Sequence, residues 1–263
     1  MSEITQQVKI KNSHIAATRN VTAFHALVTR LINRSPDQGG LGVFYGWSGL
    51  GKSKSASFAA QSTQAAWVEI GQYTTAKKLM EYILLELQVV QKGSVADMID
   101  AAVQALAENP ERPLIIDESH WLVERRMTEV IKELSDKSGA PIIMIGEEML
   151  PHGLAQSERV WRRVLEPVPA LPADMDDARK LAVYHASEIQ FNEDLLQHFV
   201  TITEGNAGWL VNNLSDAVEL AHLLGVERIG LAEWGDRAVR HGTLPTIRAQ
   251  SIANYPAKRR AKA

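Results

Sequence analysis

The sequence has 263 residues, of which 45% are hydrophobic and 22% are charged, proportions typical of a globular protein. It has no cysteine, which excludes a disulfide scaffold, a cysteine-based zinc site and a thiol nucleophile. It also has no apolar run long enough to span a membrane, and its first residues lack the apolar stretch of a signal peptide. We therefore expect a soluble, cytoplasmic protein.

The formal net charge of −3 conceals basic ends on an acidic body. Residues 1–35 hold five basic side chains and one acidic one, and residues 237–263 hold seven basic side chains and no acidic one. The segment between them carries 16 basic and 30 acidic side chains. Such ends are typical either of terminal segments that bind a polyanion or of solvated tails.

Short apolar runs alternate with amphipathic segments in the first two thirds of the chain. A first helix is expected over residues 15–31, with Asn20 as its N-cap. After it we expect strands at 41–45, 65–70, 114–117 and 142–145, and helices at 54–61, 75–90, 95–107 and 127–135. This alternation predicts an α/β fold, in which a parallel sheet is sandwiched by helices.

The pattern changes near residue 171, beyond which only helical periodicity remains. Helices are expected at 175–187, 193–203 and 209–224, followed by a short strand or a last helix within 226–240. The chain is therefore predicted to have four parts: a basic N-terminal segment with a helix (1–35), an α/β domain (36–170), a small all-α domain (171–242) and a basic, flexible tail (243–263).

A phosphate-binding pattern, G-x-x-x-x-G-K-[ST], lies between the first predicted strand and the next helix. Its glycines let backbone N–H groups turn toward a phosphate, and the helix N-terminus adds unpaired N–H groups. We expect Lys52 to pair with the β- and γ-phosphate oxygens of ATP, and the Ser53 hydroxyl to bind Mg²⁺. The residues predicted to bind ATP are Gly46, Trp47, Ser48, Gly49, Leu50, Gly51, Lys52 and Ser53.

Two carboxylates follow the apolar run at residues 114–116. Asp117 is placed to hold Mg²⁺ through water, and Glu118 to orient and deprotonate an attacking water. A carboxylate pair at a strand end can also serve as a helix N-cap. The phosphate-binding pattern earlier in the chain favours the catalytic interpretation.

These motifs resemble the AAA+ ATPases. Within them the chain is similar to the transposition regulators, which are the phage Mu B-type proteins and the target-selection ATPases of Tn7-type transposons and insertion sequences. The resemblance covers roughly residues 15–225. It is carried by residues 46–53, 114–118, 142–150 and 155–163, and by the helical region from about 172.

The resemblance implies a helical lid domain at 171–242 and a ring or helical homo-oligomer on double-stranded DNA, with ATP at the subunit junctions. It also implies a transposase partner, and a bacterial cell, or a phage or mobile element within one, as the setting. Arg159, Arg162 or Arg163 would reach the γ-phosphate of the next subunit and stabilise charge there.

Two positions depart from the family pattern. Glu147 stands after the fourth predicted strand, where a neutral polar residue is usual, and a carboxylate there repels a γ-phosphate. Gly208 stands where the lid commonly has an arginine. The expected consequence is slow hydrolysis, stimulated by DNA or by a partner.

Contact with DNA is predicted at three basic groups. The first lies at the start of the helix after the second predicted strand, the second follows the third predicted strand, and the third is near the C-terminus. All would bind DNA phosphates without contacting the bases. Paired surface cations are also often simply solvated. The residues are Lys77, Lys78, Arg125, Arg126, Lys258, Arg259 and Arg260.

The preferred hypothesis is an ATP-dependent, sequence-nonspecific DNA-binding protein that assembles on DNA and delivers a target to a transposase. One alternative is an initiator or helicase loader of replication. Another is a P-loop switch that works through protein contacts without binding DNA.

Overall fold

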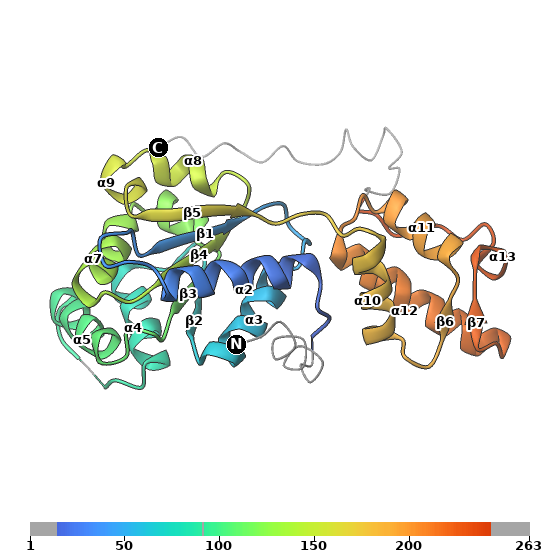
Figure 1. Cartoon of the computed structure of the whole chain (residues 1–263), viewed down its shortest axis with the longest axis horizontal. Coiled ribbons are helices and arrows are strands. Elements are labelled where there is room, and N and C mark those ends of the chain that lie inside the picture. Colours follow the sequence, from blue (N-terminus) through green and yellow to red (C-terminus); the bar gives the residue numbers. More distant parts are fainter. Residues whose placement is uncertain (1–14, 91, 243–263) are drawn as a thin grey trace, which may run out of the picture.

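The computed structural model describes residues 15–90 and 92–242. Figure 1 shows two units side by side: an α/β unit, and a smaller, mainly helical unit that follows it in the chain. Residues 1–14 and 243–263, and with them the predicted basic group Lys258, Arg259 and Arg260, lie outside the described residues. No helix in the described part is both long and apolar enough to cross a membrane.

The α/β unit is built on a five-stranded sheet with the order β2-β3-β4-β1-β5, in which every pairing is parallel. This confirms the predicted fold class, and four of the strands match the apolar runs of the sequence. The strands are β1 (Leu41–Tyr45), β2 (Ala66–Glu69), β3 (Leu114–Asp117), β4 (Ile142–Gly146) and β5 (Val164–Pro169).

The fifth strand, β5, was not predicted. Its six residues include Pro167 and Pro169, and proline cannot donate to a sheet ladder, so the segment does not have a strand-like sequence. Its place at the edge of the sheet explains why the prolines are tolerated, because only its β1 side is paired.

Helices cover both faces of the sheet (Figure 1). One core lies under α4, α5 and α7, and the other under α2 and α3. The helices of this unit are α2 (Arg19–Ile32), α3 (Lys52–Thr63), α4 (Ala76–Glu86), α5 (Val95–Glu108), α6 (His120–Glu124), α7 (Thr128–Ser138), α8 (Leu150–Ala155) and α9 (Glu158–Trp161).

Strand side chains alternate between these two cores, as the pleat of a strand requires. In β4, for example, Ile142 and Met144 enter the first core, whereas Ile143 and Ile145 enter the second. Both faces are apolar because both are covered, and so the strands read as continuous apolar runs.

Several helix boundaries differ from the prediction, those of α2 and α4 among them. Helix α2 has Thr18 at its N-cap, and Asn20 lies inside the helix with its side chain buried. Helix α4 ends at Glu86 rather than near Val90, because Gln88 adopts a left-handed conformation with φ of 62°.

The second unit, which we call the lid, has its own core of apolar residues from four helices. A parallel pair of two-residue strands also belongs to this unit. One of them falls within 226–240, where a short strand or a last helix was expected, and the other was not predicted. The elements are α10 (Met175–His185), β6 (Gln190–Phe191), α11 (Glu193–Ile202), α12 (Ala207–Leu224), β7 (Arg228–Ile229) and α13 (Leu231–Trp234).

The approach of Gly39 to β5 gives a test of the sheet. A Cβ at Gly39 would overlap the backbone carbonyl of Arg163, which accepts a hydrogen bond from Leu41 N–H at 2.9 Å. Because neither backbone can move without breaking this pairing, Gly39→Ala should lower the free energy of unfolding by roughly 1–3 kcal/mol. Denaturant titration measures the change.

The matched control is Gly71→Ala, since a Cβ at Gly71 meets no atom within 4 Å. Equal stability of the two variants would contradict the packing described for β1 and β5.

Candidate functional site

The loop between β1 and α3 needs glycine at three positions. Gly46, Gly49 and Gly51 have φ values of 156°, 84° and 84°, which L side chains rarely adopt. Gly51 is the N-cap of α3, so the helix begins at Lys52 and its first N–H groups face the end of the loop. This is the local geometry of an anion site, and it agrees with the predicted phosphate-binding pattern.

Lys52 lies against this loop. Its Nζ donates to the carbonyls of Gly46 and Trp47, at 2.7 and 2.8 Å. Burial lowers the pKa of Lys52, and four nearby carboxylates oppose that shift; they belong to Glu118, Asp117, Glu147 and Glu148. The Lys52 ammonium is therefore surrounded by the carboxylates of these four residues.

The predicted carboxylate pair stands at the end of β3. Asp117 is buried, and its Oδ1 accepts the N–H of Glu118 at 2.9 Å. Glu118 has a φ of 56°, a left-handed conformation that is costly for a glutamate and turns the chain sharply after the strand. Strain of this kind is common at functional sites.

Burial raises the pKa of Glu118, and the charge of Asp117 raises it further, whereas His120 and Lys52 oppose the shift. The Nδ1 atom of His120 lies 3.3 Å from Glu118 Oε2. This distance places the histidine beside the predicted catalytic carboxylate. A carboxylate with a raised pKa is a stronger base for a water proton.

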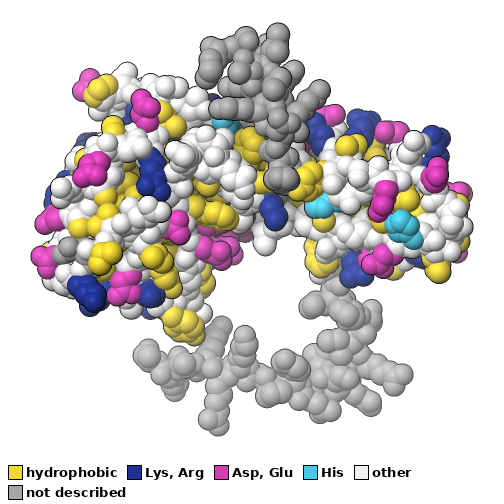
Figure 2. Space-filling model, turned by 90° about the horizontal axis from the view of Figure 1, so that it is seen from below, with side chains coloured by type: hydrophobic (Ala, Val, Ile, Leu, Met, Phe, Trp, Pro, Cys, Tyr) yellow, Lys and Arg dark blue, Asp and Glu magenta, His cyan; other side chains and the backbone are white. Residues whose placement is uncertain are grey.

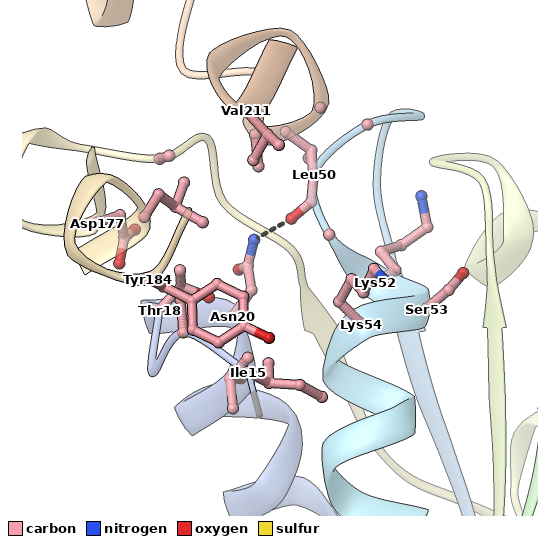
Figure 3. Close-up of a pocket in the computed structure, with 18 of the residues that line it drawn as sticks. Ile15, Thr18, Asn20, Leu50, Lys52, Ser53, Lys54, Asp177, Tyr184 and Val211 are labelled. Carbon is pink, nitrogen blue, oxygen red and sulfur yellow. Dashed lines mark hydrogen bonds between the residues drawn. The ribbon is translucent and has the colours of Figure 1, made fainter. Parts of the chain in front are cut away.

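A cavity of about 510 Å³ opens over the loop. Figure 3 shows Lys52, Ser53 and Lys54 on one wall, with Ile15, Thr18 and Tyr184 across from them. The chain segments that enclose it are the loop with the start of α3, the residues before α2, Glu118, and lid helices α10 and α12. Figure 2 shows the molecule hollowed between its two units.

Much of the cavity lining outside the loop is apolar. It includes side chains that sequence reasoning missed, because they come from distant segments with no motif: Ile15, Val21, Leu181, Tyr184 and Val211. His185 also lines the cavity, and burial, followed by the charge of Lys54, lowers its pKa. A phosphate-binding loop beside apolar walls suits a nucleotide.

The residues present fit ATP with Mg²⁺. Ser53 lines the cavity, and the Asp117 carboxylate lies at the end of β3, which β4 separates from β1. Among residues 15–90 and 92–242, no three His, Asp or Glu side chains cluster as a metal site. A magnesium ion bound with a nucleotide needs only one or two protein ligands, since phosphates and waters complete its shell.

None of the three candidate arginines lines the cavity. Arg163 Nε is paired with Asp136 at 2.6 Å, and Arg162 is paired with Glu158 at 2.8 Å on the surface. Burial alone would raise the pKa of Asp136, but the hydrogen bonds from Lys132 and Arg163 lower it. Arg159 is exposed, and within the described residues it forms no ion pair.

Four of the predicted DNA-contact residues lie in the described part of the chain, in two pairs at α4 and after α6. Arg125 donates a hydrogen bond to the carbonyl of Gln72, which brings the end of α6 against the loop before α4. Lys78 is paired with Glu81 at 3.0 Å. Lys77 and Arg126 are exposed, and the structure shows neither in an ion pair among the residues it describes.

The two departures from the family pattern also have clear positions. Glu147 follows β4, is exposed, and contributes to the electrostatic surroundings of Lys52. Gly208 has no side chain to offer, but its N–H donates to the carbonyl of Gly49 in the loop, at 3.0 Å. The lid therefore touches the loop through its backbone.

Comparison with known families supports the fold assignment. A sequence model of the AAA domain matches residues 34–154, and the parallel sheet with its flanking helices is the fold of AAA+ P-loop NTPases. No curated protein sequence matches the chain significantly.

Three solved structures are similar to the chain. Cdc6p from Pyrobaculum aerophilum has a TM-score of 0.58 and 17% identity, and the match covers 80% of this chain and 63% of that one. The Orc1 protein of Aeropyrum pernix, solved with DNA, has a TM-score of 0.58 and 16% identity, with coverage of 85% and 66%. A Walker-type ATPase of Pyrococcus abyssi has the same TM-score and identity, with coverage of 74% and 66%.

At these identities the similarity shows the fold. The chain covers less than two thirds of each of these three proteins.

Proposed function

We propose that this chain is an ATP-dependent, sequence-nonspecific DNA-binding ATPase that assembles into oligomers on double-stranded DNA and recruits and stimulates a transposase. The observation that carries the ATPase part is the cavity in which the phosphate-binding loop, Glu118 and the lid meet. The transposase part rests on the resemblance of residues 142–150 and 155–163 to transposition regulators.

In this proposal the loop N–H groups and Lys52 hold the triphosphate of ATP. Mg²⁺, held by Ser53 and Asp117, would neutralise phosphate charge. Glu118 accepts a proton from the attacking water. The water oxygen bonds to the γ-phosphorus, and the bond from that phosphorus to ADP breaks. Glu147 and the missing lid arginine at Gly208 make the hydrolysis slow.

Glu118→Gln should keep ATP bound but stop hydrolysis, because an amide cannot accept the proton. Lys52→Ala is the contrasting variant and should lose ATP binding, since the loop then has no ammonium. Equilibrium binding of a fluorescent ATP analogue and phosphate release measure the two effects. Wild-type turnover by Glu118→Gln would show that Glu118 is not the base.

A second protomer would complete the site through Arg159. Its guanidinium is exposed and unpaired within the described residues, whereas Arg162 and Arg163 are engaged by Glu158 and Asp136. It lies outside the cavity of its own chain, so it would act on the γ-phosphate of a neighbour.

Arg159→Ala should bind ATP normally and lower hydrolysis by about a hundredfold or more. Mixing it with Lys52→Ala should restore part of the activity, because Lys52→Ala protomers supply Arg159 to intact ATP sites. Arg162→Ala is the matched control and should hydrolyse ATP as wild type does. Failure of the mixture to recover activity would exclude action between subunits.

Lys77 and Arg126 are the residues through which we propose DNA binding. Their neighbours Lys78 and Arg125 are already occupied by Glu81 and the loop carbonyl of Gln72. Binding through phosphates alone is independent of base sequence. DNA binding would need ATP, because ATP promotes assembly. One acidic protomer offers few basic side chains to DNA, whereas an assembly places many copies of them along the duplex.

Changing Lys77 and Arg126 together to Ala should weaken binding to all duplexes alike. Each DNA phosphate that the variant no longer neutralises should flatten the log–log salt slope by about 0.9. Fluorescence anisotropy at several salt concentrations measures both effects, and Arg179→Ala, which breaks a lid pair with Glu193, is the control.

Removal of residues 250–263 tests the tail as the rival DNA-binding segment. If that truncation abolishes binding while the double variant binds normally, the DNA path proposed at α4 and α6 is wrong. If wild-type protein binds no duplex in ATP, the switch that works without DNA becomes the better hypothesis.

A replication initiator or helicase loader is the second candidate function. It is favoured by the similarity in fold to Cdc6p and to the Orc1 protein that was solved with DNA. Stimulation of strand transfer by a purified transposase would support the first candidate, and loading of a replicative helicase onto DNA would support the second.

A further inference from the structure

Five successive carbonyls of the phosphate-binding loop accept hydrogen bonds. Those of Gly46 and Trp47 accept from Lys52. The next three accept from outside the loop: Ser48 from Asn206 Nδ2 at 3.0 Å, Gly49 from Gly208 N–H at 3.0 Å, and Leu50 from Asn20 Nδ2 at 2.8 Å. Figure 3 shows the bond between Asn20 and Leu50. Two of the three outside donors belong to the lid.

These bonds fix the direction of the loop amides. In a trans peptide the C=O of one residue and the N–H of the next point in opposite directions. Carbonyls drawn toward the lid and α2 therefore turn the N–H groups of Gly49, Leu50 and Gly51 the other way. Within the described part of the chain, none of these three N–H groups donates a hydrogen bond, so all are available to an anion.

Asn206 is rigidly placed for this contact. It is the N-cap of α12, and its Oδ1 accepts the N–H of Trp209 at 3.1 Å, so its Nδ2 is left to face the loop. The fit is close, because a Cβ at Gly49 would overlap the Asn206 side chain. The same asparagine thus begins a lid helix and holds a loop peptide.

Asn20 holds the neighbouring peptide from the other side. It is buried, and besides Leu50 it bonds to both the N–H and the carbonyl of Leu171, at 2.8 Å each. Leu171 lies in the connection between β5 and the lid. This explains why Asn20 lies inside α2 rather than at its start: its amide ties the loop to the lid connection.

We propose that Asn206 is a positioning residue that orients the loop amides toward the phosphates of ATP and thereby makes phosphate affinity depend on the closed lid. The inference rests on the ATP site proposed above. By linkage, phosphate binding should in turn stabilise the docked lid to the same extent. The lid of this chain has glycine rather than arginine at position 208, and it would respond to the nucleotide through Asn206 instead.

The test separates positioning from helix capping. Asn206→Ser keeps an N-cap oxygen for Trp209 but loses the donor to Ser48, whereas Asn206→Ala loses both. Both variants should bind ATP and inorganic tripolyphosphate about two- to tenfold more weakly, as expected for the removal of one hydrogen bond. Only Asn206→Ala should melt at a lower temperature than wild type.

Asn192→Ser is the matched control, because Asn192 is the N-cap of α11 in the same lid and does not line the cavity. It should bind both ligands as wild type does. Wild-type tripolyphosphate affinity in Asn206→Ser would overturn the proposal. Wild-type protein that binds neither ATP nor tripolyphosphate would instead refute the ATP site itself.

Discussion

The structure depends on the presentation of unpaired backbone N–H groups at the start of α3. An amide without a protein partner is costly when buried, so a loop that keeps several of them free must be held by other bonds. Here the backbone carbonyls of residues 46–50 accept hydrogen bonds that fix the loop. The donors come from three parts of the chain. Helix α3, the lid and α2 therefore all hold this loop.

The sheet order serves the same loop. Because β1 and β3 are separated only by β4, the loop after β1 and the carboxylates after β3 reach the same edge of the sheet. Parallel strands bring their carboxyl ends together, and sites in such sheets form at that edge. The lid also lines the cavity and adds apolar side chains to the phosphate-binding loop.

The sequence allowed much of this to be predicted, because β1, β3 and the loop between β1 and α3 have strong local signals. It could not show β5, whose prolines disguise an edge strand, or the true place of Asn20, whose partners Leu50 and Leu171 are distant in the chain. The pairing of Arg163 with Asp136 also depended on the fold, because 27 positions separate the two residues in the chain. Long-range hydrogen bonds have no sequence period, so reading along the chain cannot find them.

Charge links this site to assembly. Four carboxylates surround Lys52, and burial still lowers the pKa of its ammonium. A triphosphate that enters such a site meets repulsion that Lys52, Lys54 and three loop amides offset only in part. The candidate arginine Arg159 lies outside the cavity of its own chain. We infer that a single protomer is short of positive charge at this site, and that a neighbouring protomer, together with the metal, would supply what it lacks. Binding of ATP and association of subunits would then favour each other, because each reduces the electrostatic cost of the other.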